Sequence, residues 1–261
     1  MPVVDLSLEG KVAIVTGGSK GIGRAIALAF AEHGADVAIA ARGAEALDRT
    51  RGEIAATGRR ALAVQADMED DEDVENLYRE TVAQLGGVDI LVNNAAVGGF
   101  PSLHETTQGQ FFKVMKVNVW TPLNLSRLCR ESMIERGGGV IINIVSNEGL
   151  RPSIGIGVYA PSKAALINMA QLMAKEWVRD GIRATCIAPG LIRTELAQRL
   201  VDAVESSGHY PSPQGRIGEA HEIAGMALLL ASPAGSYTTG ETYVVDGGEI
   251  CSGAGDMMLS G

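Results

Sequence analysis

Short apolar runs rich in valine, isoleucine and alanine recur along the chain, and polar residues rarely interrupt them. Runs that are hydrophobic at nearly every position are typical of strands buried on both faces of a parallel sheet. The predicted strands are residues 12–16, 37–41, 61–65, 90–93, 140–145, 183–188 and 242–245.

Alanine-rich stretches with helical periodicity lie between these runs, most clearly at 23–33, 70–84 and 162–179. Gly34, Gly86 and Gly181 follow these stretches, where glycine commonly ends a helix. The alternation predicts an α/β fold: a doubly wound, Rossmann-type parallel sheet of about seven strands with helices on both faces. No linker or repeat interrupts the pattern, so we expect a single domain over residues 1–261. The least regular segment, 191–218, is expected to be a lid over the substrate.

Composition narrows the possible classes of function. The chain has 261 residues, of which 46% are hydrophobic and 20% charged, and this balance excludes global disorder. A formal charge of −9 and an aromatic content of 4% argue against nucleic-acid binding through cations or base stacking. The 3 cysteines and 4 histidines have no metal-ligand spacing, so no metal site is predicted. We find neither a signal-peptide pattern nor an apolar run of roughly 18 residues, and therefore expect a cytoplasmic protein that does not enter membranes.

A glycine-rich turn, Thr16-Gly17-Gly18-Ser19-Lys20-Gly21-Ile22-Gly23, follows the first predicted strand, and a helix is expected from near Arg24. Its glycines at 17, 21 and 23 allow a tight turn and close backbone approach to a pyrophosphate. The amino end of the helix would present N–H groups to the phosphates. The spacing is GxxxGxG rather than GxGxxG, so an ordinary glycine-rich turn is the alternative. Its position after the first strand favours a dinucleotide site.

A second group of polar residues follows the fifth predicted strand. Ser146 ends that strand, and Tyr159 and Lys163 open the next helix four residues apart, on one face. An ammonium beside a phenol is expected to lower the phenol pKa from about 10 towards neutral pH. Such a group could exchange the proton that a substrate oxygen gains or loses as a hydride moves. The alternative is a surface tyrosine beside a solvated lysine, which the nearby Ser146 and the upstream glycine-rich turn disfavour.

Together these motifs resemble the short-chain dehydrogenase/reductase family over residues 8–248. In chain order they are Thr16-Gly17-x-x-x-Gly21-Ile22-Gly23, Asn93-Asn94-Ala95, Asn118, Ser146, Tyr159-x-x-x-Lys163, Pro189-Gly190 and Asp246-Gly247-Gly248. The resemblance implies that Tyr159 is the general acid/base, and that Lys163 lowers its pKa and binds the nicotinamide ribose. It further implies that Ser146 holds the substrate carbonyl and Asn118 holds a water that relays protons from Lys163.

The coenzyme contacts are predicted from the glycine-rich turn, from charge and from the resemblance together. They are Gly17, Ser19, Lys20, Gly21, Ile22, Gly23, Arg42, Asp67, Met68, Asn94, Ala95, Tyr159, Lys163, Pro189, Gly190, Ile192 and Thr194. By resemblance, the Asp67 side chain and the Met68 backbone would contact adenine, and Asn94 would stabilise the central sheet. Ile192 and Thr194 would hold the nicotinamide carboxamide.

Coenzyme choice is predicted from the end of the second strand. A fold that prefers NAD carries an acidic residue there, which binds the ribose hydroxyls. Here the expected position is Ala41, and Arg42 follows it. Arg42 could bind the 2′-phosphate of NADP, with Lys20 as a second cation. We therefore predict NADP(H) in preference to NAD(H); the alternative is that both cations are simply solvated.

The sequence thus predicts an NADP-dependent oxidoreductase that interconverts a carbonyl and an alcohol on a small molecule, with carbonyl reductases as the most similar members. The pocket wall falls in the irregular segments 97–102, 147–154 and 191–215, which leaves a 3-oxoacyl-thioester reductase or a sugar dehydrogenase as alternatives. A non-catalytic dinucleotide sensor is a third, which the intact catalytic residues disfavour. The resemblance also implies a homo-oligomer, either a tetramer or a dimer.

Overall fold

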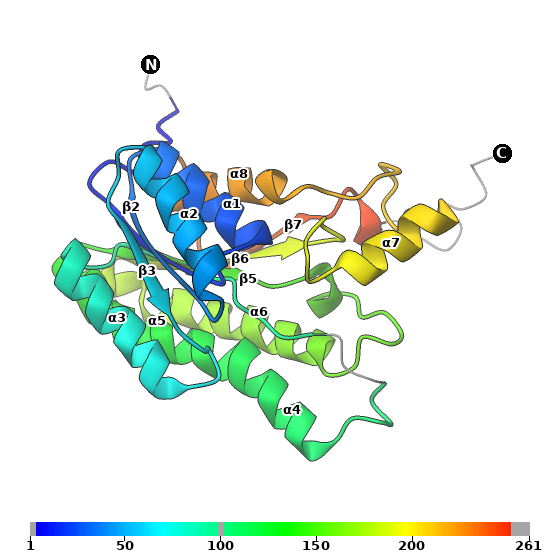
Figure 1. The fold of residues 1–261 in the computed structure, drawn as a ribbon. Helices are drawn as coiled ribbons and strands as arrows, with labels where there is room; N and C mark the ends of the chain where they lie inside the picture. Colours follow the sequence, from blue (N-terminus) through cyan, green and yellow to red (C-terminus); the bar gives the residue numbers. More distant parts are fainter. Residues whose placement is uncertain (1–3, 99–101, 252–261) are drawn as a thin grey trace.

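One parallel sheet forms the centre of the molecule in the computed structural model, which describes residues 4–98 and 102–251. Its order is β3-β2-β1-β4-β5-β6-β7 (Figure 1). The strands are β1 (Val12–Thr16), β2 (Asp36–Ala41), β3 (Ala61–Gln65), β4 (Ile90–Asn93), β5 (Gly139–Ile144), β6 (Ile182–Pro189) and β7 (Thr242–Val245). Because β1 pairs in parallel with both β2 and β4, the strand order reverses at this point. The predicted doubly wound parallel sheet is confirmed.

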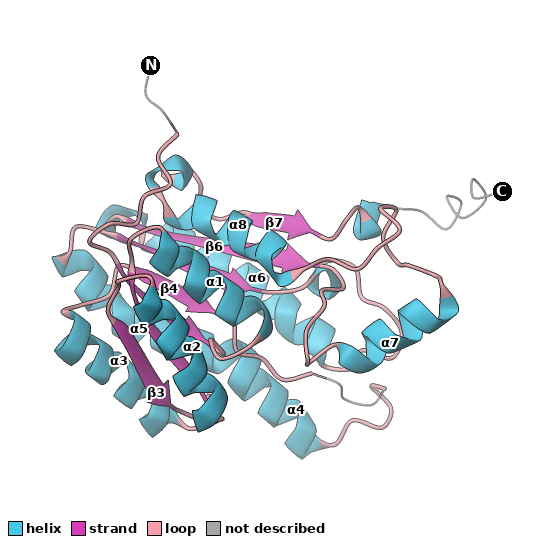
Figure 2. Cartoon of the chain, turned by 45° about the horizontal axis from the view of Figure 1, so that its top comes forward, coloured by secondary structure: helices cyan, strands magenta, loops and turns pink. Residues whose placement is uncertain are grey.

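Helices cover both faces of the sheet (Figure 2). One face packs against α1 (Gly21–Glu32), α2 (Ala44–Ala56) and α8 (Ala220–Ala231). The other packs against α3 (Asp71–Leu85), α5 (Thr121–Glu135) and α6 (Tyr159–Glu176). Two further helices are α4 (Gln108–Met115), which continues into the π-helical turn η1 (Lys116–Trp120), and α7 (Gln198–Ser207). Short 3-10 turns are η2 (Asn147–Gly149), η3 (Val178–Asp180), η4 (Pro233–Gly235) and η5 (Glu249–Cys251).

Burial on both faces explains why the strands lack an alternating pattern. All five residues of β1 are buried. Val15 joins the apolar layer under α1 and α8, whereas its neighbour Ile14 joins the layer under α3 and α5. Burial of such a side chain contributes about 1.5–3 kcal/mol, so a polar residue on either face would be costly. A continuous hydrophobic run is therefore what this architecture requires.

The first helix begins earlier than the sequence pattern predicted. It starts at Gly21 rather than near Arg24, so the last glycines of the turn form its first helical turn. The helix α6 starts at Tyr159, as predicted, although its helical periodicity is clear in the sequence only from residue 162. Pro161 is compatible with this start, because the backbone N–H that proline lacks has no partner in a first turn. Ser146 lies two residues beyond the end of β5 rather than at the end of the strand.

Segment 191–218 is more regular than expected, because it contains α7. Val201 of this helix is fully buried while its other residues remain partly or fully exposed. Gly208 ends the helix in the left-handed conformation with a φ of 67°. Leu200, Val201 and Val204 recur at helical spacing in the sequence, but the polar, proline-containing end of the segment led us to expect an irregular structure.

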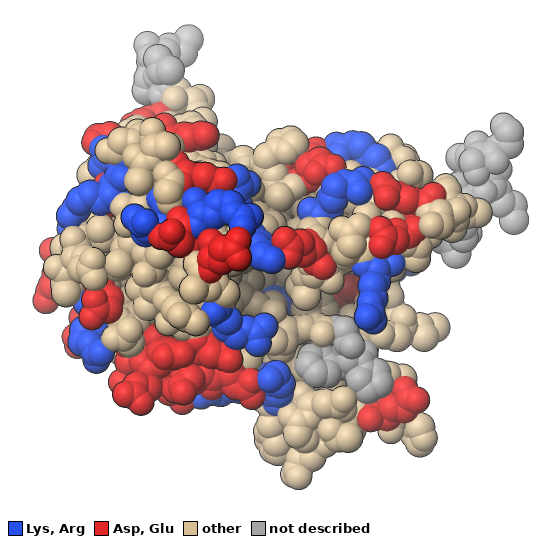
Figure 3. Space-filling view, viewed as in Figure 1, with Lys and Arg blue, Asp and Glu red and all other residues tan. Residues whose placement is uncertain are grey.

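Acidic side chains gather on the surface around the beginning of α3 (Figure 3). The carboxylate of Asp70 accepts a hydrogen bond from the Glu72 backbone N–H at 2.9 Å and so caps the helix. Lys113 pairs with Glu69 at 2.6 Å across the neighbouring surface. Negative side chains are favourable at the amino end of a helix. The acidic run is thus the solvated start of a helix.

Among the described helices, none combines the length and the apolar character that crossing a bilayer would require.

Candidate active site

A cavity of about 650 Å³ opens at the carboxyl ends of the strands, where the strand order reverses. The loops that follow β1, β2, β4, β5 and β6 all contribute to its wall. In open α/β sheets, this reversal point is where ligands bind. The cavity is long enough to bring the glycine-rich turn and the Tyr159 region into one site.

Most of the predicted site residues line this cavity. They are Gly17, Ser19, Lys20, Gly21, Ile22, Arg42, Asp67, Met68, Asn94, Ala95, Ser146, Tyr159, Lys163, Pro189, Gly190, Ile192 and Thr194. Gly23 and Asn118 are buried behind the wall instead. A side chain at Gly23 would stand 2.3 Å from the Gly17 carbonyl oxygen, so the close packing of the turn excludes one. Lining residues that the sequence pattern did not reveal include Glu69, Lys113, Glu195 and Leu196.

The glycine-rich turn has the backbone that its glycines permit. Gly17 and Gly21 lie in the left-handed region, with φ values of 65° and 51°. The Asn94 side-chain amide donates to the Thr16 carbonyl at 2.8 Å and thereby ties the turn to the end of β4. The first turn of α1 contains no acidic residue, and its N-cap residue, Lys20, makes no side-chain cap. The amino end of this helix is therefore suited to an anion such as a phosphate.

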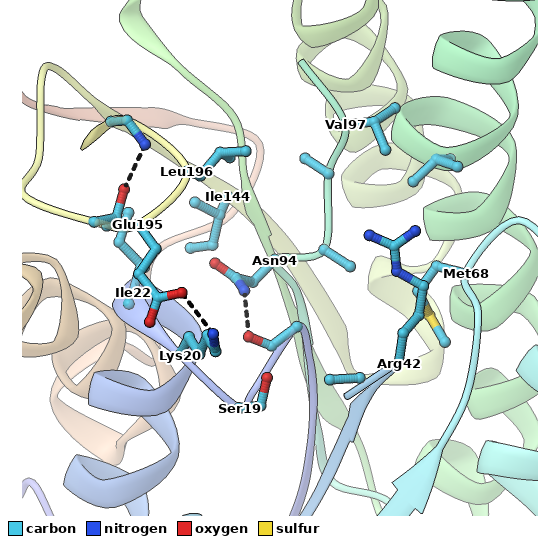
Figure 4. Close-up of a pocket in the computed structure, with 18 of the residues that line it drawn as sticks. Ser19, Lys20, Ile22, Arg42, Met68, Asn94, Val97, Ile144, Glu195 and Leu196 are labelled. Atoms are coloured by element: carbon cyan, nitrogen blue, oxygen red, sulfur yellow. Dashed lines mark hydrogen bonds and ion pairs between the residues drawn. The ribbon is translucent and has the colours of Figure 1, made fainter. Parts of the chain in front are cut away.

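The cations around the cavity differ in their partners (Figure 4). Lys20 Nζ pairs with Glu195 Oε2 at 2.5 Å, and Lys113 pairs with Glu69. The exposed Arg42 side chain lies beside the cavity and has no ion-pair partner among residues 4–98 and 102–251. Of the two cations predicted to bind a 2′-phosphate, Arg42 is thus available, whereas Lys20 is already paired with a carboxylate.

The adenine end is built from the turn after β3. The Asp67 carboxylate accepts a hydrogen bond from the Glu69 backbone N–H at 3.0 Å. The Met68 carbonyl accepts one from the Thr121 hydroxyl at 2.7 Å. These bonds hold both predicted adenine-contacting residues against the cavity, while the carboxylate of Asp67 keeps a second oxygen with which to accept further hydrogen bonds.

The predicted catalytic residues Ser146, Tyr159 and Lys163 meet at the other end of the cavity. The Ser146 side chain hydrogen-bonds to Tyr159, and its hydroxyl also caps η2 by accepting from the Glu148 backbone N–H at 3.2 Å. Lys163 Nζ lies 5.5 Å from the centre of the Tyr159 ring and donates to the Ile144 carbonyl at 2.9 Å. A side chain at Gly98 would stand 3.3 Å from the tyrosine ring, so the backbone there covers the phenol closely.

The electrostatics of this group differ from the expectation of a lowered tyrosine pKa. Burial raises the pKa of Tyr159 to about 12, although the hydrogen bond to Ser146 opposes the shift. Burial also lowers the pKa of Lys163 to about 8, because the charged ammonium is removed from water. In the ligand-free protein Tyr159 is therefore a neutral phenol at neutral pH. This state suits proton donation to a substrate oxygen.

Asn118 lies in the π-helical turn η1 and supports the site from behind. Its amide oxygen accepts from the Val97 backbone N–H at 2.9 Å, and its amide nitrogen donates to the Val97 carbonyl at 3.0 Å. The same nitrogen also contacts the Ser162 hydroxyl at 3.0 Å. The side chain thus joins the loop after β4 to α6. The water relay assigned to Asn118 stays a prediction.

Comparisons with known proteins agree with this geometry. A family profile described as enoyl-(acyl carrier protein) reductase matches residues 17–249. A 7alpha-hydroxysteroid dehydrogenase of Escherichia coli is 36% identical over 247 residues, covering 94% of this chain and 96% of the relative. A 3-oxoacyl-(acyl-carrier-protein) reductase of Chlamydia muridarum is 37% identical over 242 residues, covering 92% and 98%.

Solved structures show the same similarity. The L-sorbose reductase of Gluconobacter frateurii, in complex with NADPH and L-sorbose, has a TM-score of 0.90 and 32% identity, with 95% of this chain and 99% of that chain covered. A 7 alpha-hydroxysteroid dehydrogenase complexed with NADH and 7-oxo glycochenodeoxycholic acid has a TM-score of 0.89 and 36% identity, with 95% and 97% covered.

Proposed function

The chain belongs to the short-chain dehydrogenase/reductase family, and we propose that it transfers a hydride between NADP(H) and a ketone, an aldehyde or the corresponding alcohol. The observation that carries the proposal is the grouping of Ser146, Tyr159 and Lys163 at one end of a cavity whose other end is the glycine-rich turn. A dinucleotide needs a phosphate site and a reaction site in one continuous space, and this cavity offers both.

The residues present fit a dinucleotide. The glycine backbone at 17 and 21 allows close approach of phosphates, and the amino end of α1 carries no competing side-chain cap. When bound, the reduced nicotinamide would supply the hydride. Asp67 and Met68 would hold the adenosine end, and Ile192 and Thr194 would position the carboxamide.

Each catalytic side chain then has one task in carbonyl reduction. Ser146 would donate a hydrogen bond to the carbonyl oxygen and fix its direction. Tyr159 would deliver the proton to that oxygen as the carbon receives the hydride, so the product is a neutral alcohol. Lys163 would bind the ribose and stabilise the developing tyrosinate with its charge. In the oxidative direction, Tyr159 would act as a tyrosinate, stabilised by the charge of Lys163, and would accept the proton that the alcohol oxygen loses.

The preference for NADP(H) rests on Arg42. Similar proteins have been solved with NADPH and with NADH, so family membership leaves the choice open. In this chain, the position expected to carry a carboxylate is Ala41, and the adjacent Arg42 has no ion-pair partner among the described residues. An unpaired guanidinium at this position favours a 2′-phosphate, because it can form charge-assisted, bidentate hydrogen bonds.

Exposed apolar side chains favour a substrate with an apolar body over a sugar. Leu103, Ile154 and Leu196 are 69%, 105% and 73% exposed. Leu196 lines the cavity, and Figure 1 shows the loops around residues 103 and 154 on the same side of the molecule as α7. Of these three side chains Leu196 alone lines the cavity, where Val97 and Leu191 add apolar surface of the kind that lines ligand pockets. Of the segment 97–102 predicted to contact substrate, residues 99–101 lie outside the described residues.

The experiment that tests this function is a panel of apolar ketones and aldehydes, 3-oxoacyl thioesters and ketoses, each assayed by loss of reduced-nicotinamide absorbance with NADPH. We expect turnover of the apolar ketones or aldehydes. Exclusive turnover of thioesters or ketoses would transfer the assignment to those alternatives. Coenzyme binding without turnover of any class would favour the non-catalytic sensor.

We further propose that residues 1–261 act as one dinucleotide-binding domain in which segment 191–218 is a lid. Residues 191, 192 and 194–197 line the cavity, whereas Gly208 and Gly215 both have left-handed backbone beyond it. Exposed loops without deep packing are preferred sites of proteolysis. Limited proteolysis should therefore cut near 206–214 in the free protein and more slowly with coenzyme and substrate. Equal rates in both states would exclude a lid.

Activity should also depend on the charge of Lys163. Its pKa is lowered to about 8, so the ammonium is present below that pH and lost above it. For carbonyl reduction, kcat/KM should therefore be flat on the acid side and fall as the pH rises through about 8. In the Lys163→Arg variant, the guanidinium stays charged, so any residual activity should not show this fall. A wild-type profile that is flat from pH ~7 to ~10 would contradict the role of the charge.

A homo-oligomer is proposed as well. Phe111 and Phe112 of α4 are 43% and 60% exposed, and Leu172 of α6 is 51% exposed. Large apolar side chains gathered on helices commonly mark contacts between subunits. Light scattering coupled to gel filtration should therefore give a dimer or a tetramer.

A further inference from the structure

One ion pair joins the glycine-rich turn to the predicted lid. Lys20 Nζ donates to Glu195 Oε2 at 2.5 Å, although the residues are 175 positions apart (Figure 4). The two side chains are 53% and 70% exposed. Ion pairs this exposed contribute little to folding stability. The position of the pair, rather than its strength, therefore suggests a function.

The pair stands where the coenzyme phosphates are expected. Lys20 and Glu195 both line the main cavity and also a neighbouring one of about 350 Å³, so they form part of the wall between the two. The lid presses on the turn at the same place, since a side chain at Gly21 would stand 3.0 Å from the Thr194 methyl carbon. In the ligand-free protein, the residues beside Glu195 therefore close over the amino end of α1.

The Glu195 carboxylate lies at the amino end of α1, in a position that would also suit a bound anion. The first turn of α1 has no acidic residue of its own, and its N-cap residue is Lys20. The Glu195 carboxylate therefore lies beside the amino end of a helix and beside Lys20. Both of these groups favour a negative charge. A coenzyme phosphate would form its ion pair with the same lysine. Glu195 and the phosphate therefore compete for Lys20.

We propose that Glu195 is a positioning residue that acts through Lys20: it holds the lysine in the free protein and yields it to a phosphate of the coenzyme. The exchange would release Glu195 from the turn as the dinucleotide enters, and the neighbouring residues of the lid would then be held by the coenzyme instead. This inference rests on the proposed dinucleotide-dependent function. It adds a determinant of coenzyme affinity that lies in the lid rather than at the end of β2.

The Glu195→Gln variant removes the competing charge while keeping nearly the same shape. We expect it to bind coenzyme about 2- to 5-fold more tightly than wild type, in proportion to the strength of an exposed ion pair. The Lys20→Ala variant should bind more weakly, and adding Glu195→Gln to it should bring no gain. Isothermal titration with NADP(H), NAD(H) and ADP measures all these affinities without requiring activity.

Two controls separate this role from a general effect on the lid. Glu205→Gln makes the same chemical change in the same segment, but Glu205 pairs with Arg193 at 2.7 Å, away from the turn. Its coenzyme affinity should equal that of wild type. Glu195→Asp keeps the charge and should restore the wild-type affinity. At ~0.1 M salt, exposed charges more than about 10 Å apart are screened, and the attraction within closer pairs is weakened. The difference in coenzyme affinity between wild type and Glu195→Gln should therefore shrink as the salt concentration increases.

Comparing the affinities for the three ligands identifies which coenzyme phosphate takes the place of Glu195. A gain with NADP(H), NAD(H) and ADP alike supports exchange with the pyrophosphate, and a gain with NADP(H) alone supports exchange with the 2′-phosphate. Unchanged or weaker binding by Glu195→Gln, or a gain that persists in the Lys20→Ala background, would overturn the inference. Failure of the wild-type protein to bind any dinucleotide would instead refute the proposed function.

Discussion

Replacing Tyr159 by phenylalanine should lower kcat by ~10²–10⁴-fold, the range typical when a general acid or base is removed. The substitution keeps the ring, which fills the space beside Gly98, and removes the oxygen that is placed to deliver a proton alongside Ser146. The raised pKa of the phenol, about 12, means that wild-type Tyr159 carries this proton at neutral pH. The measurement is steady-state turnover of the best carbonyl substrate with NADPH.

Coenzyme binding serves as the control for this variant. The glycine-rich turn and Arg42 are distant in sequence from Tyr159, so the dissociation constant for NADPH should stay within a few-fold of wild type. A Phe variant that retained half of the wild-type kcat would show that another group transfers the proton.

Replacing Arg42 by alanine should reduce the preference for NADP(H) over NAD(H) by roughly 10- to 100-fold. A hydrogen bond to a charged group contributes about 1.5–3 kcal/mol, and each 1.4 kcal/mol corresponds to a factor of about ten. Arg42 carries most of the expected effect because the other candidate cation, Lys20, is held by Glu195 in the free protein. The measurement is kcat/KM for both coenzymes with the same substrate, in wild type and in the variant.

Arg51→Ala provides a matched control on the neighbouring helix. Arg51 is an exposed arginine of α2 that pairs with Asp48 at 2.7 Å and has no place in the cavity wall. Its loss should leave the ratio of the two kcat/KM values unchanged. A wild-type preference for NAD(H), or an unchanged ratio in Arg42→Ala, would contradict the assignment.

The strands could be predicted closely because burial of both faces of the sheet requires a continuous run of apolar residues in each strand. In β1, β3, β4 and β7 the predicted and observed bounds coincide, and polar or glycine residues flank the runs of β1, β4 and β7 on both sides. The helix of residues 198–207 could not be predicted in the same way. Leu200, Val201 and Val204 recur there at helical spacing, but the polar, proline-containing end of the segment led us to expect an irregular lid.

The site was predictable where local chemistry defines it and unpredictable where distant segments meet. Glycine spacing, the Tyr159–Lys163 interval and Arg42 are local signals, and all of these residues except Gly23 line one cavity. The pairing of Lys20 with Glu195 depends on a contact across 175 positions, which no local pattern encodes. The direction of the Tyr159 pKa shift was likewise hidden, because it depends on how deeply the folded protein buries the phenol.

The central claim is that this chain moves a hydride from the coenzyme to a carbonyl carbon while Tyr159 supplies the proton. The most direct measurement uses NADPH deuterated at the transferable position of the nicotinamide, with NMR detection of the alcohol product. Wild type should place one deuterium on the carbinol carbon for each coenzyme oxidised, and Tyr159→Phe should slow this transfer by the factor given above. An alcohol without deuterium, or undiminished transfer in the variant, would contradict the account.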